Sequence, residues 1–431
     1  MTAITRHAPI PAWSLPLALC LMLLATWCVH LPMMLWDHID LVPIYDAWQR
    51  GALSASQFWA IHDGSHFHSA AYAVLLLTTA LSGGKPWLDC IAAWGFYAVF
   101  ALTLWRLVGI GWQTTQPARG WWWAMLLLIA HPGHLANLQW GWQVAVFISL
   151  LGAVVPILVL CGARPTHLLN LLAVVLAVTG VLGFSTTLVA FPIAVALIAV
   201  RGEWTWLRRF ALALPWCVAG SGMVAWLLHA RGQGVAVHDV GVLLHYALNY
   251  VGGGVLRFAD DLAPWWAGLA LLLALPMAYR CRQRAHARVW LALMAFAVGC
   301  ALLTALGRAG PFGAEHALVS RYASFSLLFW IGWLGLAVTA MAGEAGLRRW
   351  LRPLLIATLV FAAANGLHLA KKAWSLHQRA TAYAAVVRTT YPNVDAATME
   401  QAYGDRAALA QEWLALLKAW GFAPFDAAAD D

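Results

Sequence analysis

Residues 13–35 read WSLPLALCLMLLATWCVHLPMML and contain no Asp, Glu, Lys or Arg. At about 1.5 Å per helical residue, this run is long enough to cross a hydrocarbon core of about 30 Å. Arg6 precedes it, as in a signal peptide, but no small-residue cleavage site follows. We therefore expect a first membrane span that the mature chain retains.

The composition of the whole chain agrees with a membrane location. Of 431 residues, 62% are hydrophobic and only 10% are charged, whereas soluble domains carry roughly 25% charged residues. The seven cysteines form no CxxC pair, so neither a disulfide framework nor a zinc ribbon is indicated. The sequence predicts an integral membrane protein.

Further apolar runs predict an all-α, polytopic helical bundle. If every run crossed the membrane, both termini would share one side and the basic loops would alternate between sides. The run at 67–84 is short and ends in Gly-Gly-Lys-Pro, so we expect it to be a juxtamembrane helix along the outer interface. Eleven spans then remain: 13–35, 88–109, 120–137, 142–161, 166–183, 185–200, 210–229, 263–279, 289–306, 321–341 and 353–370.

With eleven spans, most basic residues of the loops fall on one side of the membrane. The expected cytoplasmic segments hold 14 basic residues against Glu203 and Glu344, as the positive-inside rule requires. The net charge of +8 therefore indicates topology and not a nucleic-acid partner. We expect a multi-pass protein of the bacterial inner membrane with a cytoplasmic N-terminus and a periplasmic C-terminus. The basic residues are Arg6, Arg106, Arg119, Arg164, Arg201, Arg208, Arg209, Arg280, Arg282, Arg284, Arg288, Arg348, Arg349 and Arg352.

Two units are expected along the chain. Residues 1–370 would form the transmembrane domain, with a first periplasmic loop at 37–87, and 371–431 would form a small periplasmic helical tail. Within the tail, 407–420 repeats apolar residues at helical spacing and predicts one amphipathic helix. The run at 166–200 predicts two short spans broken at 183–187; a single tilted span there would invert every earlier loop.

Carboxylates and histidines are concentrated in the first outer loop. Asp37 and Asp40 directly follow the first span, where a carboxylate could take a proton from an attacking hydroxyl as a general base. The alternative is a solvated, Asp-rich loop. His62, Asp63 and His66 could bind substrate or hold a divalent cation such as zinc or manganese.

Polar residues also interrupt a later apolar run, 120–137. A His-Pro-Gly-His stretch at 131–134 comes before a full span is complete, and Asn137, Gln139 and Gln143 follow it. Such residues are tolerated at membrane depth where they face protein or a water-filled cavity, so we expect this end to line a cavity. The alternative is a short helix that ends in an ordinary loop.

Arginines near the expected outer face could bind an anion. Arg321 lies at a helix start, where the helix dipole favours negative charge, and a bound lipid phosphate or pyrophosphate would explain a guanidinium there. Arg308 and Arg257 could share this role, beside Glu315 and His316 as substrate-binding residues. The alternative for Arg321 is a side chain that extends to lipid headgroups. The glycines at 252–254 do not match a nucleotide-binding loop.

Taken together, these motifs resemble bacterial multi-pass glycosyltransferases of the GT-C superfamily, in an uncharacterised branch. The resemblance rests on the acidic first loop, on HDGSH at 62–66, NLQWGWQ at 137–143, Gly307-Arg308, SRY at 320–322 with Phe325, and GFAPF at 421–425. It spans most of the chain. The sequence departs from the pattern in having no Asp-x-Asp, only Asp37-x-x-Asp40.

The resemblance implies an inverting enzyme that moves a sugar from a polyprenyl-phosphate donor to a lipid, glycan or protein acceptor. Asp37 or Asp40 would be the base, His62 and His66 would orient substrate or metal, and Arg308 and Arg321 would hold the phosphate. A transporter or flippase of a lipid-linked sugar or other amphiphile is the alternative, although no internal repeat is visible. An acyltransferase using His62 or His316 is a third class.

Overall fold

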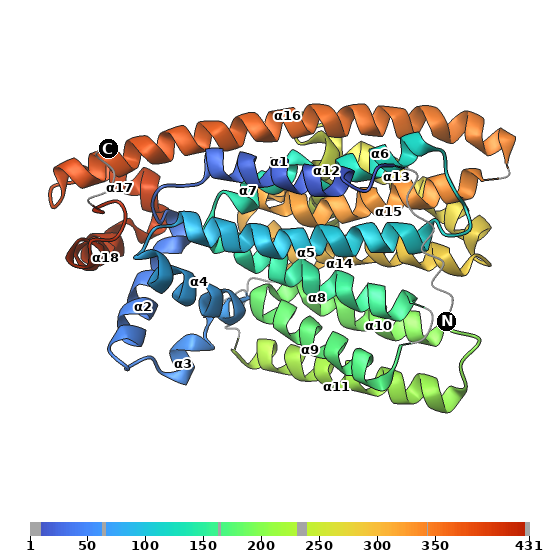
Figure 1. Cartoon of the computed structure of the whole chain (residues 1–431), viewed down its shortest axis with the longest axis horizontal. Coiled ribbons are helices and arrows are strands. Elements are labelled where there is room, and N and C mark those ends of the chain that lie inside the picture. The colour runs from blue at the N-terminus through green and yellow to red at the C-terminus, as the bar shows by residue number, and fades with distance from the viewer. Residues whose placement is uncertain (1–9, 63–65, 163–164, 231–238, 343, 427–431) are drawn as a thin grey trace.

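The chain folds into a long bundle of helices that lie roughly along one axis (Figure 1). The computed structural model describes residues 10–62, 66–162, 165–230, 239–342 and 344–426. Among these residues the only strands are β1 (Ile61–His62) and β2 (His66–Phe67), which form one antiparallel pair. The prediction of an all-α fold is therefore confirmed.

The α-helices are α1 (Ser14–Val29), α2 (Leu41–Gln49), α3 (Ala55–Phe58), α4 (Ser69–Ser82), α5 (Trp87–Gly111), α6 (Arg119–Ile129), α7 (Leu135–Leu138), α8 (Val144–Cys161), α9 (His167–Gly183), α10 (Ala190–Ala199), α11 (Trp206–Ala230), α12 (Val240–Leu256), α13 (Ala263–Cys281), α14 (Arg288–Phe312), α15 (Ala323–Met341), α16 (Ala345–Thr390), α17 (Ala396–Tyr403) and α18 (Ala407–Trp420). Short 3-10 helices are η1 (Trp36–Asp40), η2 (Pro132–His134), η3 (Gly141–Gln143), η4 (Ser185–Val189), η5 (Ala285–Ala287), η6 (Ala314–Leu318), η7 (Ser320–Tyr322) and η8 (Gly404–Arg406).

Several of these helices are suited to a membrane. In the described part of the chain, six helical segments are long and apolar enough to cross one, and they include α5, α8, α11, α14, α15 and α16. Five more apolar helices are shorter than 18 residues, among them α1, α9 and α12. Some expected spans form shorter helices because polar residues or proline end them early: α1 stops at Val29, before His30 and Pro32, and α6 stops at Ile129, before His131.

Both predicted breaks in the apolar runs are confirmed. After α6, Pro132 begins η2, since proline cannot continue the helical hydrogen bonding of the preceding residues. After α9, the chain becomes extended at Phe184 and re-enters a helix through η4. Glycines let α8 and α9 approach closely: a Cβ on Gly152 would lie 2.8 Å from the Gly180 Cα.

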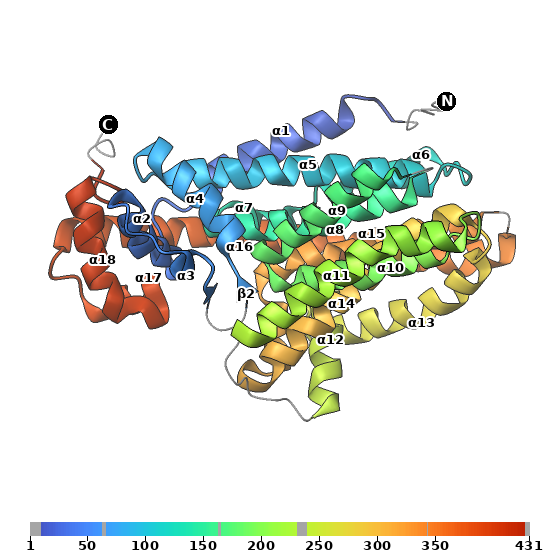
Figure 2. The same ribbon diagram turned by 90° about the horizontal axis from the view of Figure 1, so that it is seen from below.

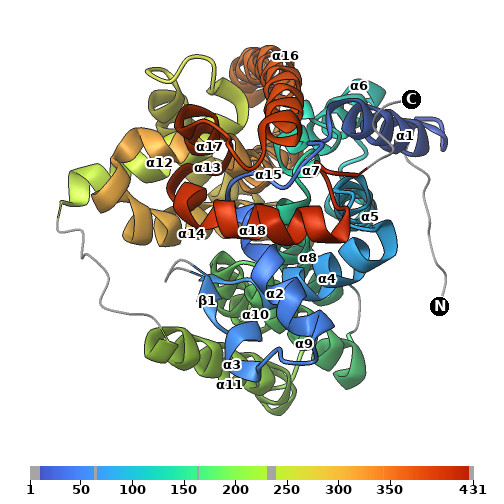
Figure 3. The same ribbon diagram turned by 90° about the vertical axis from the view of Figure 1, so that its left-hand side faces the viewer.

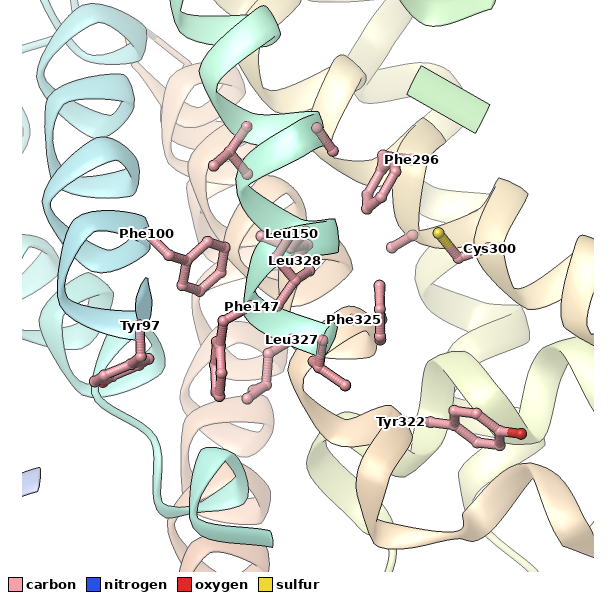
Figure 4. Close-up of a cluster of buried hydrophobic side chains, with 14 of the residues drawn as sticks. Tyr97, Phe100, Phe147, Leu150, Phe296, Cys300, Tyr322, Phe325, Leu327 and Leu328 are labelled. Carbon is pink, nitrogen blue, oxygen red and sulfur yellow. The ribbon is translucent and has the colours of Figure 1, made fainter. Parts of the chain in front are cut away.

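The core lies around α8 and α15, which run between other long helices in the view from below (Figure 2) and lie near the middle of the bundle when it is seen from its end (Figure 3). Every residue of α15 is buried. Figure 4 shows Phe147 and Leu150 of α8 beside Phe325, Leu327 and Leu328 of α15. The core therefore continues up to Phe325, near the end of the bundle at which α15 begins.

The small helices gather at that same end. α2 and α3 of the first loop and α17 and α18 of the tail lie together there (Figures 1 and 3). α16 runs without a break through the boundary expected at 370, so the tail is an extension of the last long helix. The predicted amphipathic helix is confirmed at Ala407–Trp420, and its Trp420 ring contacts Tyr45 of α2 at 5.4 Å.

One core contact allows a direct test of this packing. A Cβ on Gly335 of α15 would lie 2.3 Å from the Trp290 ring, whereas Gly268 of α13 has no atom within 4 Å of its Cβ position. We expect Gly335→Ala to lower the unfolding free energy by about 1–3 kcal/mol through overpacking, while Gly268→Ala has no such cost. Unfolding of both variants in detergent measures this; equal stability would contradict the packing of α14 against α15.

Candidate functional site

A cavity of about 310 Å³ lies where the first loop, two helix breaks and the tail meet. It brings together six residues predicted from the sequence as site residues, drawn from six separate segments. They are Asp37 of η1, His66 of β2, Gln143 of η3, Arg308 of α14, His316 of η6 and Arg321 of η7. Two more charged residues, Asp405 and Arg406, also line it. The rest of the wall is mostly aromatic, hydroxylic or aliphatic, with Trp142, Phe184, Ser185, Thr186, Leu227, Tyr250, Leu303, Thr304, Phe312, Tyr322 and Phe325. We call this the first cavity.

A second cavity of about 410 Å³ adjoins the first. Asp37, Arg321 and Asp405 line both cavities. Gln139, another predicted residue, lines only the second. Asp37 and Arg321 therefore lie where the two cavities meet.

Asp37 is positioned by an unusual backbone. The preceding residue, Trp36, has a φ of 50°, a left-handed conformation that bulky residues rarely adopt and that stores strain. The Trp36 ring packs edge-on against Trp140 at 5.2 Å, which holds the strained residue in place. This geometry directs the chain so that the half-buried Asp37 lines both cavities.

Asp40 has a different environment, although it lies only three residues away. Arg406 of the tail reaches it with Nε at 3.2 Å and NH2 at 3.1 Å from Oδ2, and His62 Nε2 lies 3.7 Å from the same oxygen. Burial raises the pKa of Asp40, while Arg406 opposes that rise. Asp40 does not line either cavity. Its carboxylate therefore anchors the tail to the first loop.

The histidines of the first loop stack on aromatic rings. His66 stacks on Phe184 at 4.4 Å, and His68 stacks on Trp142 at 4.1 Å. Burial, and then the charges of neighbouring groups, lower the pKa of His66 well below its usual value. Asp63 lies outside the described residues, and within these no group of three or more His, Cys, Asp or Glu side chains could hold a metal ion.

Three arginines line the first cavity, and one of them, Arg406, is paired with Asp40 and Asp405, whereas Arg308 and Arg321 form no ion pair with a described residue. The Arg308 guanidinium lies 5.5 Å from the Phe312 ring centre, and that of Arg321 lies 5.5 Å from the Tyr322 ring centre. Within the described ranges, neither guanidinium forms an ion pair with a carboxylate. Both are therefore available for an anion.

His316 completes this side of the cavity. Its Nδ1 lies 3.2 Å from the Tyr246 hydroxyl, and its ring stacks on Phe312. Burial, with the charges of Arg321 and Arg308, lowers the pKa of His316 to about 4. The imidazole is therefore neutral at pH 7 and can exchange hydrogen bonds with a hydroxyl group.

The remaining predicted residues do not line the first cavity. Glu315 precedes His316 in η6 and is exposed. Asn137 is buried and donates to the Arg321 carbonyl oxygen at 3.0 Å, and Gln139, with its amide nitrogen turned toward them, donates to the Val29 and Ala373 carbonyls. Arg257 is only 7% exposed and lines neither cavity. Asn137 and Gln139 thus support the walls around the site.

A buried pair next to the site was missed from the sequence. His38 Nε2 lies 3.5 Å from the Asp89 carboxylate, which also accepts a hydrogen bond from the Thr78 hydroxyl. Burial lowers the pKa of His38 to about 3, so its imidazole is neutral. The sequence could have indicated Asp89, because it is a charged residue at the start of an apolar helix. The pair holds η1, and with it Asp37, against α4 and α5.

Comparison with protein-family models, with curated proteins and with solved structures gives no match. The kind of ligand that the site can bind is therefore inferred from its own residues. The first cavity combines the Asp37 carboxylate, two arginines that form no ion pair with a described residue, the Asp405–Arg406 ion pair, neutral imidazoles and an aromatic wall. This set suits a ligand with a negatively charged group, hydroxyls and an apolar part.

The ion pair between the loop and the tail can be measured directly. The Asp40 and Arg406 side chains are 17% and 14% exposed, so we expect a coupling energy of about 0.5–3 kcal/mol between Asp40→Asn and Arg406→Gln in a double-mutant cycle of unfolding. The control cycle uses Arg280→Gln and Glu344→Gln, whose partners are each 48% exposed and should couple by about 0–1 kcal/mol. Equal coupling in the two cycles would contradict a role for Asp40 in anchoring the tail.

Proposed function

We propose that this protein is an integral membrane glycosyltransferase of the GT-C type. It would take a sugar from a polyprenyl-phosphate donor and pass it to a lipid, glycan or protein acceptor at the periplasmic face of a bacterial inner membrane. The observation that carries the proposal is the first cavity, in which Asp37 lies together with Arg308 and Arg321, two arginines that form no ion pair with any described residue.

Each part of the cavity has a place in this reaction. Arg308 and Arg321 would bind the donor phosphate, since guanidinium groups bind phosphate oxygens in a bidentate manner. The sugar would lie against aromatic rings such as Tyr322 and Phe325, with Gln143 and His316 bonded to its hydroxyls. His66 would orient the sugar from the side of the first loop.

Transfer with inversion needs one base, and the geometry favours Asp37 over Asp40. As the acceptor oxygen forms its bond to the anomeric carbon, the bond from that carbon to the phosphate oxygen breaks and polyprenyl phosphate leaves with the electron pair. The acceptor proton passes to Asp37, which lines the cavity. Asp40 is engaged by Arg406 and lines neither cavity.

The topology that fits this proposal has eleven spans. The six long apolar helices would be joined by shorter helices, including α1, α9 and α10, and the first loop and the tail would share the periplasmic side. The basic segments, such as the start of α16 with Arg348, Arg349 and Arg352, would then be cytoplasmic. α4 would lie near the outer interface, as the short run at 67–84 indicates.

Transport of a lipid-linked sugar remains the alternative function. It would require coupling groups and a path toward the opposite end of the bundle. The first and second cavities are instead both lined by segments of one end, namely η1, η7 and η8. This placement favours chemistry at one face.

The test is replacement of each carboxylate in cells that lack the chromosomal copy. Loss of a general base costs about 10²–10⁴ in rate, so we expect Asp37→Asn to abolish addition of one sugar mass to an envelope glycan, glycolipid or protein, as read by mass spectrometry. Asp40→Asn is the matched control and should retain transfer at equal protein level. Full activity in Asp37→Asn would rule out this base, and an unchanged envelope in the deletion strain would favour transport.

A further inference from the structure

The second cavity has a chemistry of its own. Its walls come from η1, α7, η7, α16 and η8, with Trp36, Trp140, Val319, Leu369 and Leu376 as the apolar part. Three cations line it: Arg321, which it shares with the first cavity, and Lys372 and Arg379 of α16. Lys372 and Arg379 are seven residues apart, and this spacing places both side chains on one face of the helix.

These cations lack carboxylate partners among the residues that the structure describes. Arg379 donates to the Ser375 hydroxyl at 2.8 Å. Over the described ranges, neither Lys372 nor Arg379 forms an ion pair. The lining carboxylates are Asp37 and Asp405, and Asp405 is paired with Arg406 at 2.5 Å. The cavity therefore has more free positive than free negative charge.

Two buried hydrogen-bond donors that line the second cavity have no acceptor among the described residues. Trp140 is 6% exposed and Tyr403 is fully buried, and both line the cavity. The Trp140 Nε1 and the Tyr403 hydroxyl have no hydrogen-bond partner within the described part of the chain. Buried polar atoms are nearly always hydrogen-bonded, so two unpartnered groups that can donate, in one cavity, indicate an acceptor-rich ligand.

Arg257 adds positive charge beside α16, since its backbone N–H donates to Asn365 of that helix. All three of its guanidinium nitrogens are buried without a hydrogen-bond partner among the described residues. Asn365 lies seven residues before Lys372 on the same helix. A buried, unpaired guanidinium is costly, and an anion in the adjacent cavity would offset that cost.

We infer that the second cavity binds a phosphate group, and that this phosphate belongs to the acceptor. The inference rests on the proposed function, in which the first cavity takes the donor phosphate. Because Asp37 lies at both cavities, an acceptor held by its phosphate at Lys372 and Arg379 would place a hydroxyl near the base. The acceptor would thus be a phosphate-bearing molecule, either a membrane phospholipid or a separate phosphorylated glycan carrier.

Binding of radiolabelled inorganic pyrophosphate to the full chain in phosphatidylcholine nanodiscs tests this without turnover. We expect two bound molecules in the wild type. Lys372→Gln with Arg379→Gln should weaken one of them at least tenfold, and Arg308→Gln should weaken the other. Lys371→Gln is the matched control, because Lys371 is exposed on the same helix and lines neither cavity.

The two proposals fail in different ways. Unchanged binding in the Lys372 and Arg379 variant, or an equal loss in Lys371→Gln, would overturn the second site. Unchanged binding in Arg308→Gln would overturn the donor site alone. If the double variant does not fold, Tyr403→Phe removes one hydroxyl, and it should still weaken one site; no effect would count against the inference.

A second arm identifies the source of the phosphate. The same titration is run in nanodiscs that contain phosphatidylglycerol. Weaker pyrophosphate binding at the Lys372 site there would support a phospholipid acceptor. Unchanged binding would support an acceptor that carries its phosphate outside the bilayer lipids.

Discussion

A helix that ends inside an apolar bundle leaves backbone N–H and C=O groups that only protein partners can satisfy. Most of the site depends on this constraint. Asn365 of α16 donates to the Gly253 and Gly254 carbonyls and accepts from the Arg257 N–H, which supports the end of α12. His131 accepts from the Gly133 N–H, and its other ring nitrogen lies 2.7 Å from the Ala362 carbonyl. These buried polar side chains make irregular backbone possible beside the cavities.

Arg406 of the tail determines which of the carboxylates near the two cavities are paired. Arg406 pairs with Asp40 and with Asp405, so one guanidinium occupies two carboxylates. Among the described residues, the Asp37 carboxylate forms no ion pair. The same is true of four cations that line the cavities, Arg308, Arg321, Lys372 and Arg379. As far as the described residues go, a ligand that enters either cavity therefore meets cations without an ion pair and one carboxylate without one, that of Asp37.

Local patterns in the sequence predicted the local structure well. The helix at 407–420, the break at 183–187 and the polar stop at 131–134 were each visible from apolar spacing, glycine and proline. The number of spans was less predictable, because hydropathy does not show where a helix stops inside an apolar run: in 13–35, helix α1 ends at Val29.

Several residues of the candidate site could be predicted from the sequence, but the residues with which they form contacts could not. Asp37, Arg308, Arg321 and His316 were found as costly polar groups, and the structure places them in one cavity. The difference between Asp37 and Asp40 could not be read from the sequence, since Arg406 lies 366 residues from Asp40. Lys372, Arg379 and Tyr403 were missed because the chain was expected to leave the bundle after 370, whereas α16 continues to Thr390.

The most direct test of the central claim is the position of a polyprenyl phosphate bound to this protein. A cryo-electron microscopy map of the full chain with that lipid should show its phosphate between Arg308 and Arg321, with the prenyl chain leading away from the aromatic wall. A phosphate held at the opposite end of the bundle, near Arg348 and Arg352, with the first cavity empty, would contradict the account.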